Sequence, residues 1–252
     1  MPVIEMRRAE KTLPGSLGAV RPQKVLPLYS GCRRITDPVI GAGRWLPWAL
    51  AGKRACDVAG AAVFLLLLAP LFLLLMLMIR LDSPGPAFFW NERIGLHGRL
   101  FRICKFRTMR HRALDERDGL MAEAAARFFF KHKTDPRVTR LGYFLRKYSL
   151  DELPQFWNVL RGEMSLIGPR PLLKEDFARQ HRNDPLFLLW AQKRHDLWPG
   201  ITGLWQVSGR SELGFEESLR MDLHYVAHWT PRLDAYILLR TLPAILQGRG
   251  AY

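Results

Sequence analysis

One uninterrupted apolar run limits what this chain can fold into more than any other feature. Residues Val58–Ile79 read VAGAAVFLLLLAPLFLLLMLMI and include no ionisable side chain. A helix of roughly 20 apolar residues is long enough to cross the hydrocarbon core of a bilayer. The run is apolar on every face, unlike the striped helix of a soluble protein, and it begins too far along the chain to be a signal peptide. We therefore predict a membrane protein.

The charges around this run predict how it lies in the membrane. Lys and Arg outnumber Asp and Glu in residues 1–52 and again in residues 99–147. Basic flanks stay on the cytoplasmic side, and one straight span cannot keep both of them there. Pro70, near the middle of the run, removes a backbone donor and kinks a helix. We favour a re-entrant helix hairpin over residues 53–82, kinked at Pro70; a single span with an internal proline is the alternative.

The rest of the chain predicts an arm and one further domain. Residues 1–52 are rich in Pro, Gly and Arg without periodicity, which is typical of a flexible basic arm. Residues 83–252 mix strand-like and helical patterns and predict a cytoplasmic α+β domain. Tryptophan favours the headgroup region of a membrane, so this domain should carry interfacial amphipathic helices. Its tryptophans include Trp190, Trp198, Trp205 and Trp229.

Local patterns predict the order of elements in this domain. LFRICKFRTM is strand-like, and on a strand its alternate residues share one face. Residues 109–160 are mostly helical in pattern, and residues 184–200 form an amphipathic helix. We expect loop and strand for GITGLWQVSGR, and helix again from Phe215 onward.

The composition points to an anionic partner. The formal net charge is +15 and the sequence pI is about 10.4, which suits nucleic acid, an anionic membrane surface or phosphorylated substrates. Cys32, Cys56 and Cys104 lie far apart without CxxC spacing, so we expect reduced thiols in the cytoplasm rather than a disulfide framework. The histidines lack the spacing of a zinc site.

The stretch YSLDELPQFWN sets Asp151 and Glu152 side by side within basic sequence. Ser149 and Glu152 have the spacing of a capping box, which would make the acids a helix start. The N-cap is either Ser149 or Asp151, and this choice decides whether Pro154 removes a helical hydrogen bond. A capping role is compatible with a second one, in which the acids meet a metal ion and a phosphate.

Basic motifs around the acid pair favour this second role. LIGPRP holds Arg170 between two prolines, which fixes its direction for forked recognition of a phosphate. KFRTM places Lys105 and Arg107 on one strand face. Each motif alone is as easily a solvated surface. Together they suit a diphosphate that cations and Mg²⁺ neutralise, so that an aspartate can attack its phosphorus.

Several motifs in order resemble one known family. KRACDV, FRICKFRTM, LRKYSLDELPQFWNVLRGEMSLIGPRP, PGITGLWQVSGR and DLHYV resemble the bacterial sugar transferases, the monotopic polyprenyl-phosphate phosphoglycosyl transferases. The resemblance covers roughly Lys53 to Tyr252. It implies transfer of a sugar 1-phosphate from a UDP-sugar to undecaprenyl phosphate with Mg²⁺ and release of UMP. This is the first membrane step of exopolysaccharide, capsule or O-antigen synthesis.

The resemblance also implies roles for particular residues. Asp151 is the nucleophile that forms a covalent aspartyl-phosphosugar intermediate, Glu152 is its partner, and both are candidate Mg²⁺ ligands. Ala69 stands where many members have a serine before the proline of the helix break, which leaves the detail of the kink open. The family's arginine that meets the lipid phosphate falls on Arg146, and its motif cations fall on Lys105 and Arg170. The full set of candidate substrate-binding residues also includes basic residues of the neighbouring motifs: Lys105, Arg107, Arg137, Arg146, Arg170 and Arg210.

The implied location is the bacterial cytoplasmic membrane, with the catalytic domain on its cytoplasmic face. Implied partners are the two substrates and the membrane, not nucleic acid; downstream glycosyltransferases and a second copy of the chain are further candidates. GLWQVSGR and the ending RTLPAILQGRGAY resemble the rhizobial galactosyl-phosphate transferases, so we expect UDP-galactose as donor, with UDP-glucose second.

Two other functions compete with this one. A membrane-tethered nucleic-acid-binding protein would account for the net charge, but it would not explain the presence of Asp151 and Glu152. A non-catalytic scaffold of a polysaccharide complex would keep its function in the Asp151→Asn variant.

Overall fold

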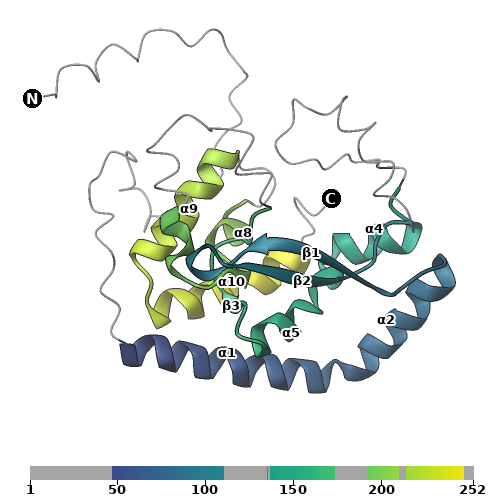
Figure 1. Ribbon diagram of the computed structural model, residues 1–252, viewed down its shortest axis with the longest axis horizontal. Helices are drawn as coiled ribbons and strands as arrows, with labels where there is room; N and C mark the ends of the chain where they lie inside the picture. The colour runs from purple at the N-terminus through teal and green to yellow at the C-terminus, as the bar shows by residue number, and fades with distance from the viewer. Residues whose placement is uncertain (1–46, 111–134, 136, 174–191, 210–213, 247–252) are drawn as a thin grey trace, which may run out of the picture. The chain divides into compact units, whose positions relative to one another are not determined.

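The computed structural model describes residues 47–110, 135, 137–173, 192–209 and 214–246, all within one compact unit (Figure 1). Helices and two small sheets alternate along the chain, which confirms the predicted mixture of α and β structure. The elements are α1 (Pro47–Leu67), α2 (Ala69–Asp82), β1 (Phe88–Ile94), η3 (Leu96–Gly98), β2 (Leu100–Phe106), α4 (Arg140–Lys147), η4 (Leu150–Glu152), α5 (Gln155–Leu160), β3 (Ser165–Ile167), η5 (Arg194–Asp196), β4 (Gly200–Thr202), α8 (Leu204–Ser208), α9 (Phe215–Ala227) and α10 (Pro231–Leu246).

The apolar run forms two helices that meet at an angle. α1 and α2 are bent by 62° on either side of Leu68. Pro70 lies in the first turn of α2, where its missing N–H costs little, while its ring keeps α1 from continuing. The predicted kink is therefore confirmed. The predicted end of the arm is too late, because residues 47–52 belong to α1; the arm up to residue 46 lies outside the described residues.

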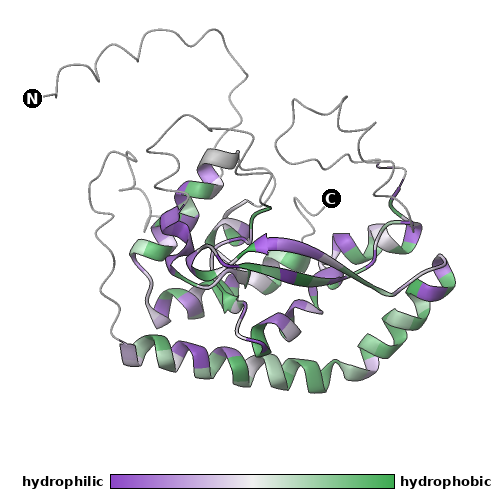
Figure 2. Cartoon of the chain, viewed as in Figure 1, coloured by the Kyte–Doolittle hydropathy of each residue, from purple (hydrophilic) through white to green (hydrophobic). Residues whose placement is uncertain are grey.

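Length and composition are consistent with a membrane segment only when α1 and α2 are taken together. No single helix among the described residues is both long and apolar enough to cross a bilayer, whereas the bent pair meets the requirements of length and composition when its two helices are counted together. Figure 2 shows apolar residues continuing along both helices. Large apolar side chains on the pair are exposed, among them Phe64, Leu66, Leu67, Leu73, Leu74, Leu77 and Leu81.

The inner faces of α1 and α2 pack on the β1–β2 hairpin and its neighbours. β1 and β2 are antiparallel, with Phe88 opposite Phe106. Ala61 of α1 joins Phe101 and Ile103 of β2 in one apolar cluster. Leu75 of α2 joins Phe106 in a second cluster. The two clusters therefore connect β2 to both helices of the bent pair.

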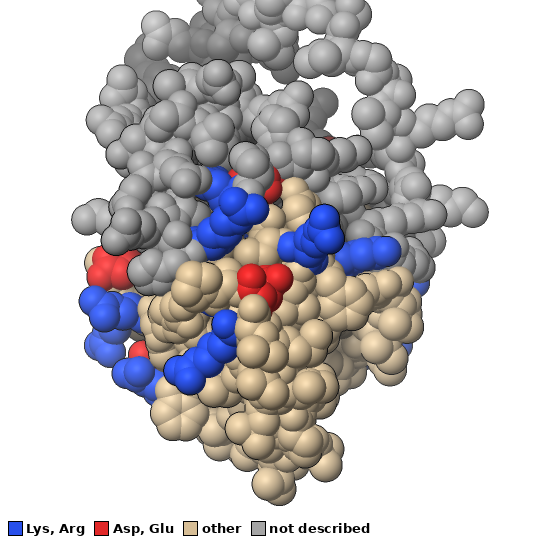
Figure 3. Space-filling view, turned by 90° about the vertical axis from the view of Figure 1, so that its right-hand side faces the viewer, with Lys and Arg blue, Asp and Glu red and all other residues tan. Residues whose placement is uncertain are grey.

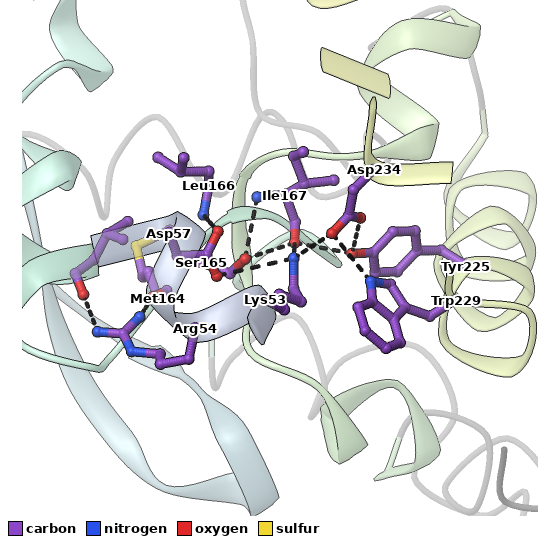
Figure 4. A network of polar contacts seen from close by, with 11 residues as sticks. Lys53, Arg54, Asp57, Met164, Ser165, Leu166, Ile167, Tyr225, Trp229 and Asp234 are labelled. Atoms are coloured by element: carbon purple, nitrogen blue, oxygen red, sulfur yellow. Dashed lines mark hydrogen bonds and ion pairs between the residues drawn. The ribbon is translucent and has the colours of Figure 1, made fainter. Parts of the chain in front are cut away.

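A buried polar network ties α1 to the C-terminal helices (Figure 4). Nζ of Lys53 lies 2.7 Å from Oδ2 of Asp234 in α10 and donates to the carbonyl of Ile167 at 3.0 Å. Asp234 also accepts from the Tyr225 hydroxyl and from the Trp229 indole. Lys53, at the basic edge of the apolar run, therefore links α1 to α10 through Asp234 in addition to contributing a positive charge.

Three local predictions need correction or fall partly outside the described residues. Leu204–Ser208 is the helix α8 rather than strand or loop; Trp and Val in this stretch favour strands, but packing overrides that preference because Leu204 and Trp205 are buried. Helical structure between Met109 and Leu160 is confirmed for α4 and α5 only, since residues 111–134 and 136 are not described. Most of the helix predicted for 184–200 is likewise not described, and its described end is the short turn η5.

Candidate active site

The acid pair lies beside the end of β2. Nζ of Lys105 is 2.6 Å from Oε1 of Glu152 and 3.9 Å from Oδ2 of Asp151. The exposed side-chain fractions are 22% for Lys105, 13% for Asp151 and 30% for Glu152, so solvent or a ligand reaches all three. Residues that are distant in sequence therefore form one charged cluster, as the motifs predicted.

The capping box predicted for Ser149 and Glu152 is not formed. Ser149 adopts the left-handed conformation, with φ of 55°, and its side chain makes no capping hydrogen bond. A capping side chain needs an extended backbone at that position. Neither Ser149 nor Asp151 begins α5, because Pro154 is its N-cap. The Glu152 carboxylate instead pairs with Lys105.

Helix α4 brings Arg146 to this cluster. Its Nε donates to the hydroxyl of Thr108 at 2.9 Å. Burial lowers the pKa of Arg146, while the nearby charges of Asp151 and Asp135 raise it. Gly142 allows α4 to approach this closely, because a Cβ there would lie 2.0 Å from the Thr108 carbonyl oxygen. Arg146 and Asp151 are therefore close enough to interact electrostatically.

Arg137 reaches the same region but is engaged by another acid. Its Nε and Nη2 donate to the two carboxylate oxygens of Asp135 at 3.0 and 2.8 Å. These hydrogen bonds hold the pKa of Asp135 below its usual value, against an opposing effect of burial. Both residues are buried, so Arg137 orders the chain before α4.

The Arg107 side chain hydrogen-bonds to the backbone outside the site. β2 ends at Phe106, so the alternation that places Lys105 on one face does not extend to Arg107. Its guanidinium is buried and donates to the carbonyls of Pro84 and Ile79, at 2.8 and 3.1 Å. Arg107 therefore satisfies carbonyl groups at the end of α2. Its predicted role in substrate binding has no support in this geometry.

A pocket lies between Glu152 and the GPRP loop. Three cations line it, Arg93, Lys105 and Arg170, together with the Glu152 carboxylate. The carboxamides of Gln155 and Gln206 line it as well. Arg93, Gln155 and Gln206 were not among the predicted site residues. Figure 3 shows the right-hand face of the view in Figure 1, where basic side chains surround a small group of acidic atoms.

Both backbone polar groups of Arg170 are hydrogen-bonded to other parts of the protein. Its N–H donates to Oδ2 of Asp222 at 3.3 Å, and its carbonyl accepts from Nη2 of Arg194 at 2.8 Å. Arg194 and Asp222 form an ion pair with both side chains buried, and burial raises the pKa of Asp222 against the effect of Arg194. The Arg170 guanidinium lies 4.7 Å over the Trp205 ring, a cation–π distance.

This support for Arg170 was only partly foreseeable. The two prolines predicted a loop with a fixed backbone, and hydrogen bonds to Asp222 and Arg194 hold the backbone of Arg170 there. The motif DLHYV contains Asp222, which was given no role. GLWQVSGR contains Trp205, which was expected at a membrane interface but is buried. Arg194 carried no sequence signal. Arg210 lies outside the described residues.

The acid pair has the donor set of a shared magnesium site. The described residues include no cluster of three or more His, Cys, Asp or Glu side chains. Asp151 and Glu152 offer carboxylate oxygens only. Mg²⁺ commonly takes one or two protein carboxylates, keeps several waters and binds substrate phosphates. The pair therefore fits Mg²⁺ that is held jointly with a diphosphate.

Comparison with known proteins places these residues in one matched region. The family model for bacterial sugar transferases matches residues 48–248. The exopolysaccharide production protein ExoY of Rhizobium meliloti is 41% identical over 205 residues, which are 79% of this chain and 88% of that protein.

Two longer relatives match over the same part of the chain. The undecaprenyl-phosphate galactose phosphotransferase of Salmonella typhimurium is 40% identical over 79% of this chain, and the undecaprenyl-phosphate glucose phosphotransferase of Komagataeibacter xylinus is 41% identical over 81%. The matched region covers 41% and 38% of those two proteins. This chain thus spans less than half of the longer relatives.

Proposed function

Because this chain belongs to the bacterial sugar transferase family, we propose that it transfers a sugar 1-phosphate from a UDP-sugar to undecaprenyl phosphate and releases UMP. The reaction class is that of an undecaprenyl-phosphate sugar phosphotransferase, as two of its relatives are named. One observation carries the proposal: Lys105 joins both acids at 2.6 and 3.9 Å beside a pocket that Arg93 and Arg170 also line.

The pocket supplies the charge that a diphosphate needs. A carboxylate and a diphosphate repel each other, so an attack requires positive charge around the phosphorus. Lys105, Arg93 and Arg170 provide it without a rearrangement of the backbone. Mg²⁺, held by Glu152 and Asp151 together with the phosphates, would add Lewis-acid stabilisation of the developing charge.

In the first step, a carboxylate oxygen of Asp151 attacks the phosphorus that carries the sugar. A bond forms between Asp151 and that phosphorus, and the bond to the bridging oxygen of the diphosphate breaks, so that UMP leaves with the electron pair. In the second step, an oxygen of undecaprenyl phosphate attacks the same phosphorus and displaces the Asp151 carboxylate. Arg146 is the cation beside Asp151 that would hold the lipid phosphate.

The donor proposed first is UDP-galactose, with UDP-glucose second. The names of the relatives support galactose and leave glucose as the alternative. The product would begin an exopolysaccharide or a related surface polymer, as the name of the ExoY relative suggests. Downstream glycosyltransferases would then extend it.

A donor panel tests the activity directly. Purified protein is given UDP-galactose, UDP-glucose and their N-acetylated counterparts, with Mg²⁺ and undecaprenyl phosphate, and UMP release is measured. We expect release that requires both Mg²⁺ and the lipid, fastest with UDP-galactose. No release with any donor would refute the proposed reaction, while release with another donor would refute only the sugar.

We further propose that α1 and α2 enter and leave the membrane on its cytoplasmic face. The 62° bend and the exposed apolar side chains of both helices support this placement, as do the basic flanks. The domain that follows would then lie on the cytoplasmic surface of the bacterial inner membrane.

Cysteine labelling tests this placement. Single cysteines at Trp48 and Asp82, which are exposed near the two ends of the helix pair, are placed in a variant without Cys32 and Cys56. A membrane-impermeant thiol reagent should label neither site in spheroplasts with an intact inner membrane, and should label both in inside-out vesicles. Labelling of one site alone in spheroplasts would show a single span.

A further inference from the structure

The backbone of the GPRP loop is held by two kinds of partner. Just before Arg170 the partner is another backbone group, since the Pro169 carbonyl accepts from the N–H of Gly200 at 2.9 Å. At Arg170 the partners are charged side chains: its N–H donates to Asp222 at 3.3 Å, and its carbonyl accepts from Arg194 at 2.8 Å. Hydrogen bonds to charged groups are stronger than those between neutral groups. Arg194 and Asp222 therefore set the position of the backbone at Arg170.

The stability of the fold does not by itself account for the Arg194–Asp222 ion pair. Both residues are 2% exposed. One nitrogen, Nη2 of Arg194, donates to the Asp222 carboxylate and also to the Arg170 carbonyl. Among the described residues, Nε and Nη1 of Arg194 and Oδ1 of Asp222 find no hydrogen-bond partner. A buried ion pair with unsatisfied polar atoms is often no more stabilising than apolar residues of similar size.

The segment that the pair holds carries a side chain of the pocket. Arg170 lines the pocket together with Lys105 and Glu152. Its guanidinium lies 4.7 Å over the ring of Trp205, which is buried. The ion pair thus fixes the backbone end of Arg170, and the indole fixes the charged end. A cation that is placed in advance stabilises developing charge without reorganisation, and a small displacement of such a group is costly for the rate.

We propose that Arg194 and Asp222 are positioning residues for the transfer reaction, because they fix the backbone of Arg170 so that its guanidinium meets the donor diphosphate. This inference rests on the proposed function and extends it to residues outside the pocket. Neither side chain is among the described residues that line the pocket, so both act through Arg170 and neither touches the donor.

The first test compares the double variant Arg194→Met/Asp222→Leu with its two single variants, by thermal unfolding in detergent and by UMP release. Each single variant leaves one charge buried alone, so the double variant should have a higher Tm than either. Its kcat/KM for the UDP-sugar that the wild-type protein prefers should nevertheless stay at least roughly ten-fold below wild type, because Arg170 has lost both backbone contacts. Part of this loss should be a higher KM, which a smaller folded fraction would leave unchanged.

The second test repeats the measurement in a protein that carries Arg170→Met. If the pair acts through Arg170, its removal there should change kcat/KM by less than about two-fold. The same cycle is measured with Asp222→Asn, which is nearly isosteric, so that the test does not depend on the folding of the double variant. Asp222→Asn should lower kcat/KM in the wild-type background and have little effect beside Arg170→Met.

Lys193→Met is the matched control, since Lys193 is the residue before Arg194 in the chain. Its ion pair with Asp196, at 3.7 Å, is about one-third exposed on both sides. A partly exposed pair contributes little to stability, and kcat/KM of this variant should stay within about two-fold of wild type.

Three results would overturn the proposal. One is a recovery of kcat/KM along with Tm in the double variant, which would make the pair purely structural. Another is an equal loss of kcat/KM with and without Arg170→Met, which would show that the pair acts by a route other than Arg170. The last is a KM unchanged from wild type in every variant of the pair. Failure of the proposed function is distinct from these, because the wild-type protein would then release no UMP from any UDP-sugar.

Discussion

Lys53 and Lys105 both pair with carboxylates, yet their surroundings are opposite. The Lys53 side chain is 3% exposed and lies 2.7 Å from Asp234, which also accepts from Tyr225 and Trp229. Every partner in that network is part of the protein. The Lys105 side chain is 22% exposed and lies between two acids at the edge of a pocket.

The difference separates an ion pair that holds the fold from one that awaits a substrate. A closed network stabilises only if all of its polar groups are satisfied, and removing one member leaves a buried charge alone. An open cluster keeps oxygen lone pairs available for a metal ion or a phosphorus. Substitutions in the first should therefore act on stability, and substitutions in the second on turnover.

The largest expected effect comes from Asp151→Asn in the open cluster. The amide cannot form the covalent intermediate, so kcat should fall at least about 10⁴-fold. The variant should keep its Tm and its membrane association, because Asp151 is partly exposed and packs no core. UMP release and thermal unfolding in detergent measure the two effects. Residual turnover near wild type would exclude Asp151 as the nucleophile.

The contrast between the two lysines also marks what the sequence predicts and what it does not. Asp151, Glu152, Lys105 and Arg170 stand in motifs whose chemistry is local. The structure brings Glu152, Lys105 and Arg170 to one pocket, and Asp151 lies beside Lys105. Pro70 predicted the bend because its effect on a helix is independent of context. These inferences need only residue types and short spacings.

Long-range partners could not be predicted. Asp234 and Tyr225 meet Lys53 only after α9 and α10 fold back on α1, and Arg194 reaches the GPRP loop across the fold. Arg107 was misplaced because strand alternation was continued one residue past the end of β2. The predicted capping box is not formed, because the spacing of Ser149 and Glu152 does not determine the backbone conformation of Ser149.

The second largest effect is expected for Lys53→Met in the closed network. Removing the lysine leaves Asp234 partly buried without its cation, which should lower the free energy of unfolding by roughly 3 kcal/mol. Chemical denaturation in detergent measures it. The kcat/KM of the folded fraction should not change, since Lys53 touches no pocket residue. Arg80→Met, an exposed cation at the end of α2, is the control and should have little effect on stability.

The third prediction concerns Lys105, where we expect a loss of activity with little change in stability. Lys105→Met should lower kcat/KM roughly 100-fold, the usual loss for one group that stabilises developing charge. Its stability should change by less than about 1 kcal/mol, because a partly exposed ion pair contributes little. Lys105→Arg should recover part of the activity. A large loss of stability in Lys105→Met would show that both ion pairs hold the fold and would remove the distinction between them.

The smallest effect concerns His224, the residue before Tyr225 on α9. Burial, together with the nearby charge of His228, lowers the pKa of His224 to about 4. The folded state therefore disfavours the protonated form. Stability is complete above the unfolded pKa of about 6.5 and falls as the pH drops from there toward 4. His224→Leu should flatten this dependence of Tm on pH, while Asp151→Asn should retain it. An equally steep acid dependence in His224→Leu would place the titrating group elsewhere and leave the closed network itself as the acid-sensitive part.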